Sequence, residues 1–454
     1  MRMKGERRRT ALILLLLASF LAGGCGRMAL DLRASAGGER VTITYATWGS
    51  PNERAAHERI VRKFMERYPH IEVVYRHIPE DYVKVLTTLY AGNKAPDVYM
   101  LYKHTAVQWA EQGKLYDLRP LLEADPAIGE SSFIPNAVMH GDGGSVIGIK
   151  ATEESFALYY NVELFRKAGL DPPPTRAEEA WDWDEFVRVA KRLTIDSAGR
   201  DAFHPAFDPD GIVQYGVRFN TWMWHLMVPS NGTSVVKPDG SGMNLEDPDV
   251  MDAVQRLADL MYVHHVAPNP LQEKHLPQPA LALESGMVAM NLDGQWIQLD
   301  LGAAGADYGV GVLPKLKKSH TIQFGEPLVM SATTRHPQEA WLFFKWLLDP
   351  ENAIELYADG LWMPIMLDYY TEPELIARWA TVKPGHPAGY EDAVMRQTIE
   401  NGVNSFDYYL RNNEKIAAIM NPVLDQVWLG RMSVREAFSS VSAEVQAEFR
   451  GLYR

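Results

Sequence analysis

A regular alternation of strand and helix patterns near the start of the chain constrains its fold more than any other feature. The first of three expected strands alternates apolar with polar residues and is rich in β-branched side chains, as a half-buried strand is. Two segments between them repeat apolar residues with helical spacing. The strands fall at residues 41–47, 71–78 and 97–102, and the helices at 51–68 and 80–90. This order predicts right-handed crossovers and a mostly parallel sheet, hence an α/β fold.

The carboxyl ends of these strands are where a parallel sheet places its ligands. Trp48 follows the first strand and Tyr102 ends the third, so we predict that both contact a ligand. Ser50, Pro51 and Glu53 have the spacing of a capping box with proline at the first helical position. Glu53 is therefore either a helix cap or a ligand-binding carboxylate, and Trp48 either packs over the helix start or binds ligand.

The chain is too long for one hydrophobic core. Single cores rarely exceed ~250–300 residues, so 454 residues predict two domains. Further strands and helices continue the α/β character, with a helical end to the chain. The strands are expected at residues 155–161, 288–292, 308–313 and 327–332, and the main helices at 183–193, 248–263, 337–348 and 350–358.

Charge and cysteine content exclude several functions. A net charge of −13 is unsuited to nucleic acid, which needs a basic surface. One cysteine excludes a disulfide framework and a zinc site built on paired thiolates. The Asp208–Gly211 turn resembles half a calcium loop, but Val217 stands where a bidentate glutamate is needed. We predict neither a metal nor a cofactor.

The common catalytic motifs are largely absent from the sequence. The sequence has no G-x-S-x-G, H-E-x-x-H or phosphate-binding glycine loop. Two catalytic carboxylates of a glycosidase are recognised by their ~5–9 Å separation in the fold. A secreted carbohydrate-active enzyme therefore stays an alternative, as does a lipid-anchored surface adhesin.

The N-terminus has the pattern of an export signal. Five basic residues precede an apolar stretch at residues 11–22, which small residues follow, so residues 1–24 are interpreted as a signal peptide. Cys25 comes next, in a context that resembles the bacterial lipobox, although Leu21 lies one position further upstream than usual. The resemblance implies that Cys25 is lipidated and that residues 25–40 tether an extracytoplasmic protein to the cell membrane.

Ten short motifs, in order and at family-like spacing, resemble the extracellular solute-binding proteins of carbohydrate ABC importers (family 1). They begin at residues 43–48, 64–69, 95–98, 113–118, 157–161 and 165–170, and continue at 286–291, 294–296, 308–314 and 340–346. The resemblance implies a two-lobe, class II periplasmic-binding-protein-like α/β fold with a hinge and a ligand cleft between the lobes. It also implies a non-enzymatic monomer that binds a sugar or oligosaccharide and docks, when loaded, on the transmembrane permease subunits of an importer.

The resemblance also assigns boundaries and site residues. Lobe 1 is expected at residues 41–150 plus 327–357, and lobe 2 at 151–326 plus 358–454. Glu154 follows the first expected crossing between the lobes, Glu326 lies at the second and Trp362 at the third. Asp293 and Trp296 flank a glycine in the motif expected to form a ligand loop.

Two further tryptophans complete the predicted site. Trp222 and Trp224 would share a face of an extended segment, and we expect at least one to contact the ligand. Aromatic rings stack on the CH face of a pyranose, and carboxylates accept hydrogen bonds from its hydroxyls. The length of the sugar stays open, and so does a polyol or phosphorylated polyol as the ligand.

Overall fold

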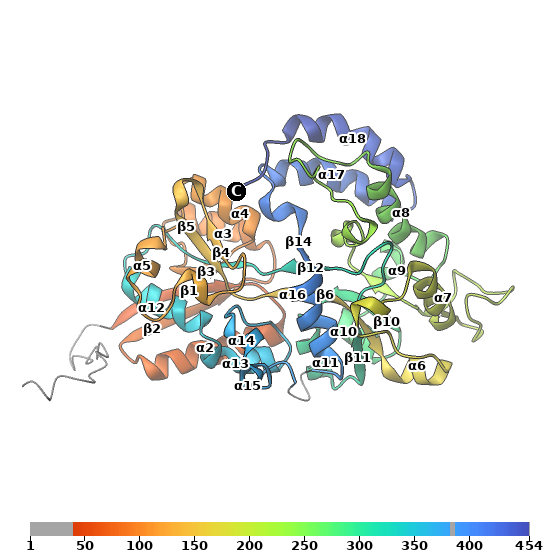
Figure 1. Ribbon diagram of the computed structural model, residues 1–454, viewed down its shortest axis with the longest axis horizontal. Coiled ribbons are helices and arrows are strands. Elements are labelled where there is room, and N and C mark those ends of the chain that lie inside the picture. The colour runs from red at the N-terminus through yellow and green to blue at the C-terminus, as the bar shows by residue number, and fades with distance from the viewer. Residues whose placement is uncertain (1–39, 382–385, 454) are drawn as a thin grey trace, which may run out of the picture. The chain divides into compact units, whose positions relative to one another are not determined.

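The computed structural model of the protein describes residues 40–381 and 386–453, and within these ranges two six-stranded sheets organise the chain (Figure 1). The first sheet has the order β2-β1-β3-β13-β5-β4. Its strands are β1 (Val41–Thr47), β2 (Ile71–His77), β3 (Val98–Met100), β4 (Val138–His140), β5 (Val146–Lys150) and β13 (Pro327–Met330). The predicted signal peptide, Cys25 and nearly all of the predicted tether lie outside the described residues.

The pairing within this sheet corrects one expectation. Strand β1 is parallel to β2 and β3, as the alternating pattern predicts. The pairs β3–β13, β13–β5 and β5–β4 are antiparallel, so a mostly parallel sheet was wrong. The reason is that β13 does not come from a local crossover helix: it returns from the second sheet and enters in the opposite direction.

Helices pack around the first sheet as their patterns predict. The capping box of α2 is confirmed, because the Ser50 hydroxyl accepts from the Glu53 backbone N–H (3.3 Å) and the Ser50 N–H donates to the Glu53 carboxylate (3.2 Å). Ala56, Ile60 and Phe64 of α2 form its buried face. The helices here are α2 (Pro51–Arg67), α3 (Tyr82–Ala91), α4 (Lys103–Glu111), α5 (Arg119–Ala124), α12 (Pro337–Leu348) and α13 (Pro350–Ala358).

The second sheet has the order β14-β12-β6-β10-β9, and β11 also pairs with β6. Its strands are β6 (Glu154–Asn161), β9 (Arg218–Phe219), β10 (Met290–Gly294), β11 (Tyr308–Gly311), β12 (Thr321–Phe324) and β14 (Gly402–Asn404). Short strands β7 (Ile195–Asp196) and β8 (Ile212–Gln214) form a separate pair. The helices of this part are α6 (Val162–Ala168), α7 (Trp183–Leu193), α8 (Pro248–Tyr262), α9 (Pro270–Glu273), α10 (Pro279–Glu284), α11 (Ile297–Ala304), α16 (Gln397–Asn401), α17 (Asn413–Trp428) and α18 (Val434–Glu448).

Two connections carry the chain between the sheets, and they lie against each other. Residues 151–153 join β5 to β6, and residues 325–326 join β12 to β13. The Ala151 N–H donates to the Glu326 carbonyl at 3.0 Å. Gly325 has φ of +147°, and a Cβ there would lie 2.3 Å from the backbone oxygen of Thr152. Only glycine fits this close approach of two backbones.

A third segment joins these connections. Glu153 and Met363 exchange both backbone hydrogen bonds, at 2.9 and 3.0 Å. The chain then runs beside α13, where the Tyr369 hydroxyl donates to Glu351, through α14 (Asp368–Thr371) and α15 (Pro373–Ile376). The π-helix η6 (Glu391–Arg396) then contacts β6 of the second sheet. The boundaries assigned to the two lobes stay a prediction.

Within the described ranges, none of the helices combines the length and the apolar character that crossing a bilayer requires.

Candidate functional site

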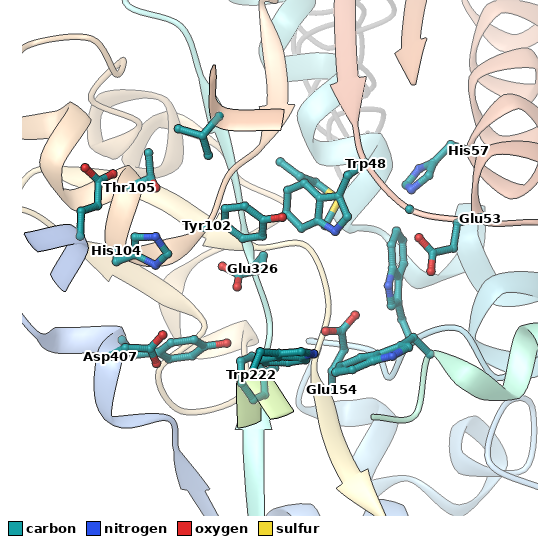
Figure 2. A pocket seen from close by; sticks show the side chains of 18 residues that line it. Trp48, Glu53, His57, Tyr102, His104, Thr105, Glu154, Trp222, Glu326 and Asp407 are labelled. Atoms are coloured by element: carbon teal, nitrogen blue, oxygen red, sulfur yellow. The ribbon is translucent and has the colours of Figure 1, made fainter. Parts of the chain in front are cut away.

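A cavity of about 720 Å³ lies where the two sheets and their connections meet. Its volume falls in the ~300–1,000 Å³ range of small-molecule sites. Residues from both sheets line it, and Figure 2 shows that Trp48 and Tyr102 face Trp222 across the space, with the carboxylates of Glu154 and Glu326 between them in this view.

Trp48 and Tyr102 form one aromatic wall at the carboxyl ends of β1 and β3. Their ring centroids are 4.7 Å apart, and the edge of Tyr82 supports Trp48 at 4.9 Å. The Tyr82 hydroxyl donates to the carbonyls of Ala46 and Met100, which fixes this support against both strands. The wall is therefore held rigidly from behind, as a stacking surface for a ligand requires.

Trp222 and Trp296 form a second aromatic wall beside the second sheet. Their rings are nearly parallel, at 26°, with centroids 6.4 Å apart. The Phe156 ring meets Trp296 edge-on at 5.4 Å. The indole of Trp296 lies over Gly294, where a Cβ would come within 2.1 to 2.3 Å of its ring atoms. Trp222 is 54% exposed, so its large apolar surface is available to a ligand.

Three glutamates are among the polar residues that line the cavity. Burial raises the pKa of Glu53 to about 8, with a contribution from the neighbouring Asp300 carboxylate. Burial also raises the pKa of Glu326 to about 8, although the Lys103 N–H donates to its carboxylate at 2.7 Å. The pKa of Glu154 lies well above its usual range because of burial and the nearby charges of Glu53 and Glu326. At neutral pH the carboxyl groups of Glu53 and Glu326 therefore retain a proton, so each can donate as well as accept a hydrogen bond.

Two buried lysines lie behind this lining. The Lys150 ammonium donates to Glu153 at 2.7 Å, and both side chains are 1% exposed. The Lys103 ammonium lies 4.5 Å from the ring centroid of Tyr408 and 4.0 Å from that of Tyr409, both in η7 (Phe406–Tyr409). Burial lowers the pKa of Lys103 to about 7. Both ammonium groups thus already have partners within the protein.

Most of the residues predicted from the sequence lie together in this cavity. Eight of the ten predicted ligand contacts line it: Trp48, Glu53, Tyr102, Glu154, Trp222, Trp296, Glu326 and Trp362. Their binding role stays a prediction, because proximity to a cavity does not show contact with a ligand.

Trp224 is not in the cavity lining, because its segment is not extended. Residues Thr221–Met223 form the 3₁₀ helix η4, in which side chains two positions apart point in different directions. Trp222 is consequently exposed to the cavity, and Trp224 packs against Phe406 and Phe438 in the core. The expected extended segment was therefore wrong, although Trp222 and Trp224 both line a second, smaller cavity.

Asp293 also lies outside the lining, behind Trp296. Its carboxylate accepts from the Asn220 amide at 2.9 Å and the Gly294 N–H at 2.8 Å, and it is hydrogen-bonded to Trp296. Burial raises the pKa of Asp293 to about 7. In this position Asp293 holds the turn formed by Gly294 and Trp296.

Several lining residues were not anticipated. His57 of α2 contacts Trp362 at 5.0 Å between ring centroids, and burial lowers its pKa to about 3, so the ring is neutral at physiological pH. Asp407 and Glu414 come from the C-terminal part, where no motif pointed to a site. His57 has the helical spacing of a core position beside Ala56, and that spacing does not reveal that its face borders a cavity.

Across residues 40–381 and 386–453, no group of three His, Cys, Asp or Glu side chains is arranged to hold a metal ion. The cavity presents two aromatic walls and a set of acceptors. Such a lining can stack on the flat faces of a ligand and accept hydrogen bonds from its hydroxyl or amino groups.

Comparison with curated proteins gives distant relatives along most of the chain. The sn-glycerol-3-phosphate-binding periplasmic protein UgpB of Brucella abortus is 22% identical over 405 residues, which are 85% of this chain and 88% of UgpB. An uncharacterized lipoprotein encoded in the oleD 5′ region of Streptomyces antibioticus is 27% identical over 354 residues, which are 73% of this chain and 72% of the relative.

Solved structures share the fold. The ABC substrate-binding protein Lmo0181 of Listeria monocytogenes, in complex with cycloalternan, superposes with a TM-score of 0.77 at 22% identity and covers 90% of this chain and 98% of its own. Maltose-bound MalE3 of T. maritima has a TM-score of 0.73 at 18% identity and covers 90% and 99%. The predicted two-lobe α/β fold of periplasmic binding proteins is therefore confirmed.

Residues 48–354 match the sequence profile described as bacterial extracellular solute-binding protein, which spans well over half of the chain. This match, the two-sheet architecture and the cavity between the sheets agree with the family proposed from the ten sequence motifs. The chain belongs to the bacterial extracellular solute-binding protein family.

Proposed function

We propose that the protein binds a sugar or oligosaccharide in the cavity between its two sheets and delivers it to the permease of an ABC importer. The observation that carries this proposal is the pair of aromatic walls, Trp48 with Tyr102 and Trp222 with Trp296, which the two sheets contribute separately. A pyranose has apolar CH faces, and rings on opposite sides of a cavity can stack on both.

The carboxylates between the walls suit the hydroxyl groups of such a ligand. The carboxyl groups of Glu154 and Glu326 lie in the lining, where they can form hydrogen bonds with the hydroxyl groups of a ligand. A buried hydroxyl without a partner costs ~1–3 kcal/mol, so a sugar needs acceptors of this kind. The structural relative MalE3 carries maltose, which supports a carbohydrate ligand here as well.

Release and capture of the ligand would use the three connections between the sheets. We assign lobe 1 to residues 41–150 plus 327–357 and lobe 2 to residues 151–326 plus 358–454, with rotation about residues 151–153, 325–326 and 362–363. Closure of the two aromatic walls on a ligand would bury it and create the surface that a permease recognises.

The family is extracellular, so the protein works outside the cytoplasm. We propose that residues 1–24 are a signal peptide and that Cys25 carries a lipid anchor on the cell membrane. The basic, apolar and small-residue order before Cys25 supports this, as does the likeness to a Streptomyces lipoprotein.

The test is a glycan library applied to the purified full-length protein, with isothermal titration calorimetry and product analysis read in parallel. A stoichiometric complex with a saccharide, and no release of shorter products, is the expected result. Binding followed by hydrolysis would favour the alternative of a carbohydrate-active enzyme. A folded protein that binds no saccharide at all would contradict the proposed function.

A further inference from the structure

The described side chains that line the cavity include several acidic groups and no strongly basic one. The described lining contains five acidic side chains and no lysine or arginine: Glu53, Glu154, Glu326, Asp407 and Glu414. His57 and His104 also line it, but burial lowers the pKa of both rings, so neither supplies a charge at neutral pH. Burial also raises the pKa of Glu53, Glu154 and Glu326, which favours their neutral forms when no cation is beside them. A cationic ligand would favour the ionised carboxylates, and no lysine or arginine of the described lining supplies such a charge.

The nearby lysines do not provide this balance for every carboxylate. Lys150 pairs with Glu153, which is outside the lining, and the Lys103 ammonium lies over two tyrosine rings. Glu326 receives the Lys103 backbone N–H. The carboxyl group of Glu154, by contrast, forms no hydrogen bond or ion pair in the described ranges, although the backbone of Glu154 pairs with Phe324 at the start of β6 and the charge of Lys150 partly offsets the rise of its pKa. Burial without a partner raises the pKa of this carboxyl group, and a cationic group beside it would stabilise the ionised carboxylate.

The helix N-termini that border the cavity are also occupied. At the start of α2, Glu53 accepts from the Ser50 N–H, and at the start of α4, Glu326 accepts from the Lys103 N–H. Many phosphate-binding sites use such N–H groups at a helix N-terminus. Here the protein's own carboxylates take that place, which disfavours a phosphorylated ligand.

We propose that the ligand is an amino sugar or an oligosaccharide that contains one, and that Glu154 pairs with its protonated amino group. This inference rests on the proposed carbohydrate-binding function and narrows its substrate class. The aromatic walls suit the same chemistry, because the faces of Trp and Tyr rings attract cations within ~6 Å. A sugar ring with one ammonium group would use the stacking surfaces and the unpaired carboxylate together.

The experiment compares matched pairs of probes that differ only at the amino group. Glucosamine, galactosamine and their β-1,4-linked disaccharides are titrated beside their N-acetylated counterparts, with sn-glycerol 3-phosphate as the anionic probe. We expect at least one amino compound to bind about tenfold or more tightly than its acetylated partner, since tenfold corresponds to ~1.4 kcal/mol. The anionic probe should show no measurable binding.

Two variants then locate the effect. Glu154→Gln keeps the size of the side chain and should abolish the preference for the amino member of the pair. Glu444→Gln removes one negative charge from the exposed face of α18, away from the cavity lining, and should leave the preference unchanged.

The outcomes separate the inference from the proposed function. Binding of neutral saccharides with no preference for amino compounds, or tighter binding of the anionic probe, would overturn the amino-sugar assignment alone. An unchanged preference in Glu154→Gln would overturn the role of Glu154. Failure of every saccharide to bind the folded protein would overturn the proposed function, and the inference with it.

Discussion

The Lys150 ammonium and the Glu153 carboxylate lie 2.7 Å apart, and each side chain is only 1% exposed. The pair bridges the last residue of β5 and the connection to the second sheet. The strand register before it and the backbone pairing of Glu153 with Met363 hold both groups in place. A buried pair of this kind is expensive to break, because the remaining charge has neither water nor a counter-ion.

We therefore expect Lys150→Met to destabilise the protein by ~3–5 kcal/mol, the usual cost of leaving one partner buried alone. The double variant, Lys150→Met with Glu153→Gln, should lose less stability than the two single variants added together. The reason is that the double variant leaves no buried charge without a partner. Guanidinium-induced unfolding, followed by tryptophan fluorescence, measures these differences.

The control is the exposed pair between Lys63 and Glu355, whose side chains are 44% and 55% exposed. Lys63→Met should change stability by less than ~1 kcal/mol. Equal effects at the buried and the exposed pair would show that the Lys150–Glu153 interaction is not desolvated in solution.

A second prediction separates a binding tryptophan from a core tryptophan. Trp296→Ala should weaken saccharide binding by more than ~2 kcal/mol, as loss of a central aromatic anchor does, with the fold largely retained. Trp346 packs against Phe64 and Tyr68 and is absent from the cavity lining. Trp346→Ala should instead lower the melting temperature while the folded fraction still binds. Normal binding by Trp296→Ala, combined with early melting, would mean that Trp296 is a core residue.

A third prediction concerns the glycine beneath Trp296. Gly294→Ala would place a methyl group within 2.1 to 2.3 Å of the present indole position, so the ring must move and binding should weaken. Gly302 of α11 is the matched control, because a Cβ there meets no atom within 4 Å. Gly302→Ala should leave affinity unchanged and raise stability slightly through its better helix propensity. Equal affinity in both variants would contradict a fixed indole position.

The fourth prediction uses the raised pKa of Glu53. The Glu53 carboxyl has a pKa of about 8 in the folded protein, whereas its ordinary value is 4.5. Between these two pH values, Glu53 keeps its proton in the folded state and loses it in the unfolded chain. The contribution of Glu53 to the free energy of unfolding is therefore fully present below pH 4.5 and is lost as the pH rises to about 8. Glutamine cannot titrate and still completes the capping box.

The melting temperature of Glu53→Gln, relative to the parent, should therefore rise steadily from about pH 5 to about pH 8 and then level off. Thermal unfolding of both proteins across this range measures the difference. Parallel curves would show that Glu53 ionises normally in the folded protein.

A fifth prediction concerns the anchor. Wild-type protein expressed in a bacterial host should partition into the membrane fraction, and mass spectrometry should find an acylated N-terminal Cys25. Cys25→Ser should leave a soluble or uncleaved form. A wild-type protein recovered from the medium, with an N-terminus downstream of Cys25, would contradict lipidation.

Local patterns predicted the elements of the fold well. Alternation of apolar residues placed β1 correctly, and the Ser50 capping box placed the start of α2, because both depend on neighbours within a few residues. The antiparallel entry of β13 depends on a return from the second sheet, some 180 residues after β5, and no local pattern encodes that direction.

The site shows the same division. Trp48 and Tyr102 were predicted at the site because the carboxyl ends of parallel strands meet at one edge of a sheet. Trp296 was predicted there because the motif around it resembles the family. Asp293 was predicted to contact the ligand, but its carboxylate lies outside the cavity lining and accepts from Asn220 and Gly294. Sequence spacing does not show whether a carboxylate faces a ligand or the backbone. The side chain of Trp224 turned inward because a single turn of 3₁₀ helix replaced the expected extended segment.

The hydrogen bonds that tie residues 151–153 to both Glu326 and Met363 have a mechanical consequence. If the three connections were separate, each could rotate about its own backbone bonds, and the two lobes would then sample many relative orientations. In the proposed closure, the connections fastened to one another would leave essentially one axis, so opening and closing would reduce to a single coordinate. The aromatic walls would then meet in the same alignment each time, and one well-chosen pair of spin labels would follow the whole motion.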